Sequence, residues 1–162
     1  MMMSLAINRK SSHLLNLELQ FSNRALETKW ATIFSLKLIR PWVKAALQQP
    51  AQVVVRLVGS AESKRLNYQY RAQNHATNIL TFTLSENTLS AELIADLLIC
   101  MPVLEKEAKK QGKTLEHHFA HLIVHGMLHA QGFDHEDEID ALAMESLEIA
   151  ILKRLKIQNP YI

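Results

Sequence analysis

Three of the eight histidines of this 162-residue chain lie in one eleven-residue stretch, residues 125–135, which reads HGMLHAQGFDH. Two of them, His125 and His129, are four residues apart, so on an α-helix both imidazoles leave the same face about one turn apart. Gly132 follows, and glycine adopts without steric cost the left-handed conformation that ends many helices. The pattern therefore predicts a long helix that ends in a sharp turn, which returns His135 towards the other two histidines.

Three imidazoles that converge on one point form the ligand set of a catalytic zinc site, whose fourth position stays open for chemistry. We therefore interpret His125, His129 and His135 as the ligands of one Zn²⁺ ion per chain. The alternative is that they are ordinary core or surface histidines, but the spacing with a glycine in register favours the metal site. Three histidines also accept nickel or copper, so the sequence does not identify the metal that is bound in the cell.

The same spacing occurs in the zinc-protease signature HExxHxxGxxH, in which the glutamate after the first histidine is the general base. Here Gly126 occupies that position. The proposed ligands are kept and the protease base is absent, which predicts a metal-dependent hydrolase whose proton transfers are organised differently. A zinc peptidase or amidase remains an alternative, in which another carboxylate such as Glu145 would have to act as the base.

The length fits a single domain, for which we expect residues 13–162, preceded by a flexible N-terminus at residues 1–12. The lone Cys100 excludes an intramolecular disulfide and favours the reducing cytoplasm; on its apolar strand we expect it to be buried. No apolar run approaches the ~20 residues of a membrane span, and the first residues do not resemble a secretory signal, so we expect no membrane association.

The charges are unevenly distributed along the chain. Residues 1–99 carry 11 Lys and Arg against 6 Asp and Glu, whereas residues 100–162 carry 7 against 10. A basic N-terminal part suits a polyanion such as RNA, although such an asymmetry more often reflects only a solvated surface.

Hydrophobic periodicity predicts an α+β fold with about four strands in a mixed sheet, packed with four to five helices. The predicted strands span residues 14–20, 52–58, 78–83 and 94–100. The predicted helices span residues 41–48, 61–71, 101–111, 115–131 and 136–156. We place Ser60 and Thr114 as N-caps, and Tyr70, Ile139 and Leu142 on buried helix faces. The helix around Pro41 either starts near Arg40 or is kinked there, and we favour a start near Pro41.

Two separate blocks resemble one protein family. Residues 125–135 resemble HGxLHLxGYDH, the signature of the YbeY family of bacterial metal-dependent endoribonucleases. Residues 66–82, which read LNYQYRAQNHATNILTF, are similar to the family's LNxxYRxxDxPTxVLSF, and ADLLIC at residues 95–100 resembles its GDIxIC. The resemblance covers about residues 53–161, whereas the first 50 residues match only loosely. Among the departures, Ala76 and Thr83 replace two prolines, which removes two rigid residues from the segment 74–83.

The resemblance implies zinc-dependent cleavage of single-stranded RNA, in the maturation of ribosomal RNA and in ribosome quality control. The ribosome or ribosome-associated proteins are then the expected partners. Arg71 matches the family's functional arginine, and its guanidinium could pair with a phosphate and stabilise charge in the transition state. Alternatively, Arg71 only ends a surface helix. A third class of function, a non-catalytic ribosome-associated RNA-binding module with a structural zinc, also stays open, as does the oligomeric state.

Two further groups near the histidines have more than one interpretation. Asp134 could orient a ligand imidazole, or it could cap the helix that follows. His118 and His121 lie on the same helix as the proposed ligands, and we interpret them as core or hydrogen-bonding histidines rather than as substrate contacts.

Overall fold

The computed structural model describes residues 14–85, 91–134 and 136–162, so the proposed ligand His135 lies outside the described residues. Four strands are present in them, β1 Leu15–Phe21, β2 Ala51–Val58, β3 Ile79–Thr83 and β4 Leu93–Cys100. The helices are α1 Arg24–Trp30, α2 Leu36–Ala45, α3 Ser60–Arg71, α4 Met101–Gln111, α5 Leu115–Ala130 and α6 Glu138–Arg154.

The four strands form one mixed sheet in the order β1-β2-β4-β3. Strands β1, β2 and β4 are parallel, and the edge strand β3 pairs with β4 in the antiparallel direction. The α+β class and the four-stranded mixed sheet are as predicted. The described residues contain six helices, one more than the upper end of the predicted range.

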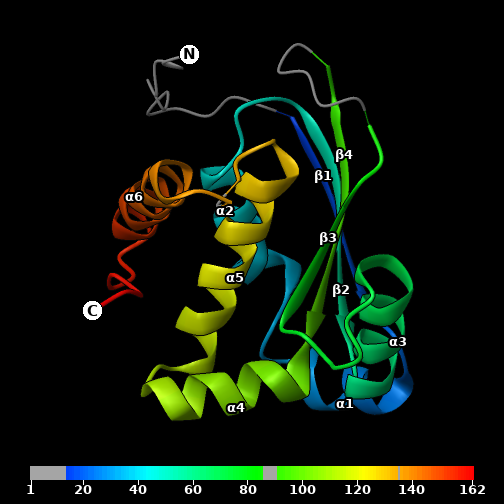
Figure 1. Cartoon of the computed structure of the whole chain (residues 1–162). Helices are drawn as coiled ribbons and strands as arrows, with labels where there is room; N and C mark the ends of the chain where they lie inside the picture. The colour runs from blue at the N-terminus through cyan, green and yellow to red at the C-terminus, as the bar shows by residue number, and fades with distance from the viewer. Residues whose placement is uncertain (1–13, 86–90, 135) are drawn as a thin grey trace.

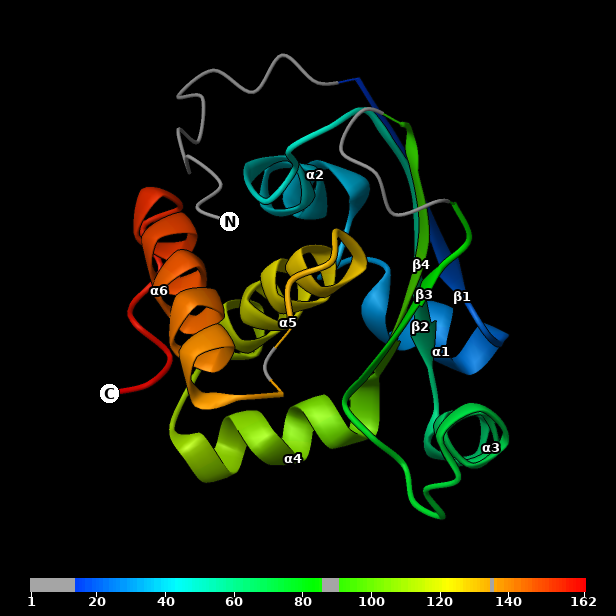
Figure 2. The same ribbon diagram turned by 45° about the horizontal axis from the view of Figure 1, so that its top comes forward.

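The helices cover the two faces of the sheet unequally (Figures 1 and 2). Helices α2 and α5 lie on one side, and α6 packs on α5 on the side away from the sheet. The larger core fills this side, where Val55, Leu97 and Ile123 are fully buried. A smaller cluster around Leu80 and Cys100 lies under α3 on the other face. The burial of Cys100 confirms its predicted role as a small core residue.

Two elements between β1 and β2 differ from the prediction. Helix α1 was missed because its seven residues bury only Trp30, which leaves no apolar periodicity to detect. Helix α2 begins at Leu36 and contains Pro41, so the predicted helix start at Pro41 is wrong. The Ser35 side chain caps α2 at the amide of Leu38, and Pro41 is exposed, so the backbone carbonyl that loses a hydrogen bond can face water.

Three side chains that were predicted to be buried are exposed: Tyr70 by 60%, Ile139 by 80% and Leu142 by 64%. The buried face of α6 runs through Met144, Leu147, Glu148, Ile151 and Leu152. Ile139 and Leu142 do not lie on the stripe that this spacing defines, because they are rotated away from it around the helix.

The buried positions of α3 are the polar residues Ser63 and Asn67 rather than Tyr70. In addition, α3 is capped by Gly59, so Ser60, the predicted N-cap, is already its first helical residue. In the part of the chain that the structure describes, no helix combines the length and the apolar character needed to cross a membrane.

Candidate active site

Helix α5 carries the first two proposed ligands, and its packing fixes the face on which they lie. The Thr114 hydroxyl accepts a hydrogen bond from the amide of His117 and so caps the helix, as predicted. Phe119, Ile123, Met127 and Leu128 are fully buried. His125 and His129 are only partly buried, at the margin of this core.

Gly126 lies where α5 packs closely on β3 and β4. A Cβ atom at this position would lie 2.7 Å from Cδ1 of Ile79, 3.2 Å from Cδ2 of Leu97 and 3.3 Å from Oγ1 of Thr81. The first distance is shorter than carbon atoms tolerate, so even a methyl group requires Ile79 to move. The glycine thus allows close packing of α5 on β3 and β4, and a larger side chain at this position would require these neighbours to move.

The end of α5 has the predicted glycine turn. Gly132 has a φ of +97°, and the amide of Phe133 donates to the carbonyl of Leu128 over 3.1 Å, the long-range bond of a Schellman motif. This turn also returns the Phe133 carbonyl to the helix, where it lies 3.2 Å from Nδ1 of His129. The turn that ends the helix therefore also provides a hydrogen-bond acceptor for the second proposed ligand.

A buried glutamine attaches this end of α5 to α2. The side-chain nitrogen of Gln131 donates to the carbonyls of Ala46 and Met127, over 2.7 and 2.9 Å, and its oxygen accepts from the amide of Gln48. Three hydrogen bonds to backbone groups thus satisfy a side chain that is only 4% exposed. They fix the position of the turn that follows His129.

His125, His129 and Arg71 line one pocket of about 200 Å³. Its other walls come from β3 and from the segment that precedes it, through Thr77, Asn78, Ile79 and Thr81. Arg71 is the last residue of α3, on the opposite face of the sheet from α5 (Figure 2), and the pocket lies at the edge strand between them. The structure therefore brings together three of the four residues that the sequence singled out; the fourth, His135, is outside the described residues.

The segment that joins α3 to β3 is held by the two buried polar residues of α3. The Ser63 hydroxyl donates to the carbonyl of Thr77 over 2.9 Å and accepts from the amide of the same residue. The Asn67 side chain donates to the carbonyl of His75 over 2.9 Å. These contacts hold the segment around Ala76 against α3 and place it next to Arg71.

A second chain of hydrogen bonds reaches the pocket from α5 through α4. The imidazole of the buried His118 contacts Glu107 over 3.0 Å, and the Glu107 carboxylate accepts from the side chain of Asn78 over 3.1 Å. The hydrogen bond to His118 is the largest influence on the pKa of Glu107; with the bond to Asn78 it outweighs burial and lowers that pKa below its ordinary value. Asn78, a pocket residue, is thereby connected to α5 through Glu107 and His118.

The hydrogen bonds of His125 and His129, the two proposed ligands that the structure describes, suit a metal site. Nδ1 of His125 lies against a carboxylate oxygen of Glu148, and Nδ1 of His129 against the Phe133 carbonyl. Both partners can only accept, so each Nδ1 carries the proton and a neutral ring keeps its lone pair on Nε2, as a metal ligand requires. Among the described residues, which do not include His135, no group of three potential metal ligands is found.

Glu148 was not recognised from the sequence. It lies on the apolar stripe of α6 and is fully buried. Burial alone would raise its pKa, but hydrogen bonds from His121, His125 and Tyr161 outweigh burial and lower that pKa to about 2. The available signal was the position itself, because a glutamate one residue after Leu147 and three before Ile151 interrupts a stripe of core residues.

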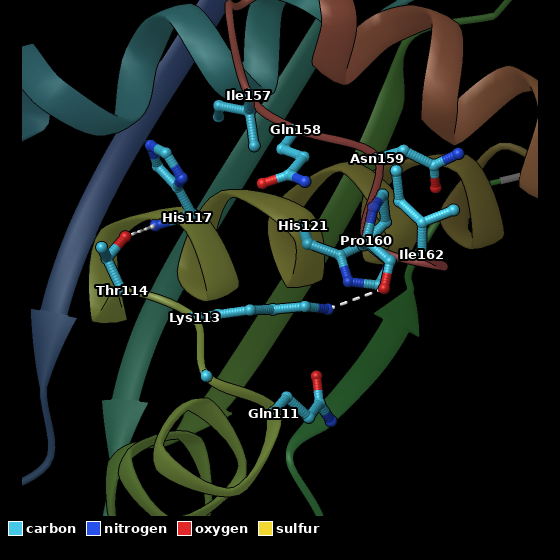
Figure 3. Close-up of a pocket in the computed structure, with 11 residues that line it drawn as sticks. Gln111, Lys113, Thr114, His117, His121, Ile157, Gln158, Asn159, Pro160 and Ile162 are labelled. Atoms are coloured by element: carbon cyan, nitrogen blue, oxygen red, sulfur yellow. Dashed lines mark hydrogen bonds between the residues drawn. The ribbon is translucent and has the colours of Figure 1, made fainter.

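The remaining groups near the histidines have roles that can be distinguished. Asp137, not Asp134, caps α6 by accepting from the amide of Asp140, so the capping role for Asp134 is wrong and its role beside a ligand stays a prediction. His118 and His121 both form hydrogen bonds to buried or partly buried carboxylates, as predicted. Figure 3 shows a neighbouring cavity of about 440 Å³, between the start of α5 and the C-terminal residues, which His117 and His121 line.

The sequence matches one protein family over most of its length. A family model described as "Endoribonuclease YbeY" matches residues 18–156. A curated protein of Polynucleobacter asymbioticus with the same name is 47% identical over 152 residues, which cover 94% of this chain and 97% of that protein. Another of that name, from Aromatoleum aromaticum, is 56% identical over 124 residues, which cover 76% of this chain and 79% of that protein.

The fold is also found among solved structures. The solution structure of TM1509 from Thermotoga maritima matches with a TM-score of 0.50 at 23% sequence identity, over 86% of this chain and 91% of that one. At this level of identity the match concerns the arrangement of helices and strands alone.

Proposed function

Because the chain belongs to the Endoribonuclease YbeY family and is thus an RNA-cleaving hydrolase, we propose that it is a zinc-dependent endoribonuclease specific for single-stranded RNA. Its setting in this proposal is ribosomal RNA maturation and ribosome quality control in the cytoplasm, with the ribosome or ribosome-associated proteins as partners. The observation that carries the proposal is the single pocket lined by His125, His129 and Arg71.

In this proposal His125, His129 and His135 hold one Zn²⁺ ion. When bound, zinc supplies Lewis acidity, which polarises a phosphoryl oxygen and acidifies water. The proton on each Nδ1 and the acceptors that face it, Glu148 and the Phe133 carbonyl, keep His125 and His129 in the tautomer that can bind a metal.

Arg71 has a separate role in binding the substrate. Its side chain is exposed at the end of α3 and lines the same pocket as the histidines. A guanidinium there can donate two hydrogen bonds to a phosphodiester, hold it next to the metal ligands and stabilise the negative charge that grows on it during cleavage.

The peptidase alternative is less well supported by the packing of α5. Gly126 occupies the position of the usual base, and a Cβ atom there would already press on the end of the Ile79 side chain. Glu145, the substitute base, lines a different pocket, of about 220 Å³, with His125 and Glu148. A non-catalytic module would bind RNA without cutting it, which is testable by the same experiment.

The test is to incubate the purified chain with a single-stranded RNA oligonucleotide and with casein, each with and without a chelator. We expect RNA to be cut, the cut to stop with chelator and to return when zinc is added, and casein to stay intact. Cleavage of casein would favour the peptidase, and RNA binding without cleavage would favour the module. A His129→Ala variant should behave like the chelated protein, whereas His117→Ala, an exposed position on the same helix, should keep its activity.

A further inference from the structure

We propose that Glu148 is a positioning residue of the active site, which fixes the ring of His125, and that Tyr161 in the C-terminal segment holds Glu148 in place. This inference rests on the proposed function, because it assigns Glu148 a role only if His125 binds a metal.

Packing does not explain a glutamate at this position. Glu148 is fully buried, on a face of α6 whose other members include Met144, Leu147 and Ile151. A buried carboxylate loses its hydration, and this loss is compensated only if hydrogen bonds replace the water. A leucine here would avoid the loss, so the carboxylate indicates a role other than filling the core.

Both oxygens of the Glu148 carboxylate are occupied. One oxygen faces Nδ1 of His125. The other accepts a hydrogen bond from the hydroxyl of Tyr161 and lies 3.3 Å from Nε2 of His121. Three groups from two other parts of the chain thus converge on one carboxylate, which cannot rotate without losing at least one of them.

The contact to His125 is the one with a consequence for the site. A carboxylate that accepts from Nδ1 keeps the proton there, sets the rotation of the ring and makes Nε2 a better electron donor to a metal. His129 depends instead on a backbone carbonyl at 3.2 Å. A change at Glu148 should therefore weaken only one of the proposed ligands directly, without altering the turn that supports the other.

Tyr161 lies in a segment that is attached to the start of α5. Figure 3 shows Pro160 of this segment beside His121, with the Lys113 ammonium donating to the Pro160 carbonyl over 2.9 Å. The rings of Tyr161 and His121 pack edge to face, with centroids 5.5 Å apart. Ile157 of the same segment is buried in the main core. These contacts fix the Tyr161 hydroxyl against Glu148.

The proposal is tested by zinc affinity, measured by competition with a chromophoric chelator, on the wild type and on Glu148→Gln, Tyr161→Phe and Glu138→Gln. The amide keeps the shape of Glu148 and removes its charge, so we expect about 10- to 100-fold weaker zinc binding. Tyr161→Phe removes only the hydroxyl and should weaken binding measurably, by up to about tenfold. Glu138 is an exposed carboxylate on the same helix, and its amide variant should bind zinc like the wild type.

Two further measurements separate positioning from general damage. The visible spectrum of the Co²⁺-substituted protein should change in Glu148→Gln, since the spectrum reports ligand geometry, and should not change in Glu138→Gln. In RNA cleavage, Glu148→Gln should lower kcat and leave KM unchanged, because Arg71 and the β3 wall still bind the substrate.

The outcomes also distinguish this inference from the proposed function. A wild type that binds no zinc and cuts no RNA contradicts the proposed function. A wild type that does both, together with a folded Glu148→Gln that has unchanged zinc affinity and an unchanged Co²⁺ spectrum, overturns the inference alone. Should Glu148→Gln not fold, Tyr161→Phe decides, since it removes no packing atoms other than the hydroxyl oxygen, and unchanged affinity there overturns the inference.

Discussion

Gly126 has one explanation in the chemistry and another in the packing. In the sequence it is the loss of a protease base, whereas in the structure it is a position at which α5 packs closely on Ile79, Thr81 and Leu97 of the sheet. The two explanations are compatible, because a larger side chain at this position would have to displace those neighbours. The packing therefore favours a small residue here, whatever reaction the site catalyses.

A Gly126→Ala variant should be less stable than the wild type by about 1–2 kcal/mol in urea unfolding. Overpacking against Ile79 costs about 1–3 kcal/mol, and the better helix propensity of alanine returns up to about 1 kcal/mol. Ile79→Val removes the methyl group that the new Cβ would contact, so the double variant should lose less than the sum of the two single losses. Strict additivity would show that the contact at 2.7 Å is relieved by other movements.

Arg71 is the residue on which the assignment of the pocket to RNA most depends. Replacing it with alanine should lower RNA cleavage by about 10²- to 10³-fold, because the phosphate loses a donor that stabilises developing charge, while bound zinc stays at one ion per chain. Cleavage rates and metal content of the same preparation would test this expectation.

The matched control for Arg71 is Arg65→Ala, on the same helix. Arg65 has a 65% exposed side chain and a weak ion pair with Glu62 at 3.8 Å. Its loss removes the same charge from α3 without touching the pocket, so cleavage should stay near the wild-type rate. Equal losses in the two variants would mean that α3 contributes only a general positive charge, and Arg71 would then have no specific role.

At the scale of elements, the contact between α4 and α5 introduces a pH dependence of stability. In the folded state the pKa of Glu107 lies below its ordinary value of 4.5, chiefly because of its hydrogen bond to His118. A carboxylate with a lowered folded pKa binds its proton more weakly than the unfolded chain does, so it stabilises the fold above about pH 4.5 and this contribution is lost as the pH falls through the folded value.

A Glu107→Gln variant should therefore show a flatter stability curve on the acid side than the wild type, measured by urea unfolding between about pH 3 and pH 6. Glu105→Gln is the control, because Glu105 lies two residues before Glu107 and therefore on a different side of α4 from the His118 contact. Glu105 pairs with Lys29 on the surface, where both side chains are exposed, so its loss should change little. If the stability of Glu107→Gln fell with decreasing pH as steeply as that of the wild type, other carboxylates would be responsible for the loss of stability in acid.

Most elements could be predicted from local patterns, and two of the failures share one physical cause. Alternation located the first strand, runs of apolar or β-branched residues located the second and the fourth, and Thr114 and Gly132 marked the ends of α5, because these signals lie within the element itself. The position of Pro41 inside α2 and the exposure of Tyr70 depend on what other elements cover. No single stretch contains that information.

The candidate site also combines features that could be predicted from local sequence with features that depend on the assembled fold. The spacing of His125 and His129 on one helix face is local and was readable, and Arg71 was identified by resemblance to a family motif. That residues of α3 and α5 line one pocket beside the edge strand β3 is a property of the sheet order. The contact between Glu148 and His125 joins residues on different helices, so only the assembled fold reveals it.

For the whole molecule, removal of the metal should lower stability as well as activity. A ligand that binds only the folded chain stabilises it by about 2.7 kcal/mol when its free concentration is a hundredfold above Kd. We expect the thermal midpoint to rise with added zinc and to fall with chelator, and we expect His129→Ala to show neither shift. A zinc-dependent midpoint in His129→Ala would place the ion elsewhere in the molecule.

The strand order also determines when the pocket can exist during folding. Leu15 pairs with Ala51, and Ala51 in turn pairs with Leu93, so each parallel ladder joins segments that are far apart in the sequence. Such pairings require the closure of long loops, which makes a chain of this kind slower to fold than a helical bundle. Helix α5 can form locally, but among the described residues β3 pairs with β4 alone and therefore takes its place only once β4 is ordered. The face of α5 that carries His125 and His129 thus forms before the pocket is complete. We therefore expect the ability to cut RNA to be among the last properties that the refolding chain recovers.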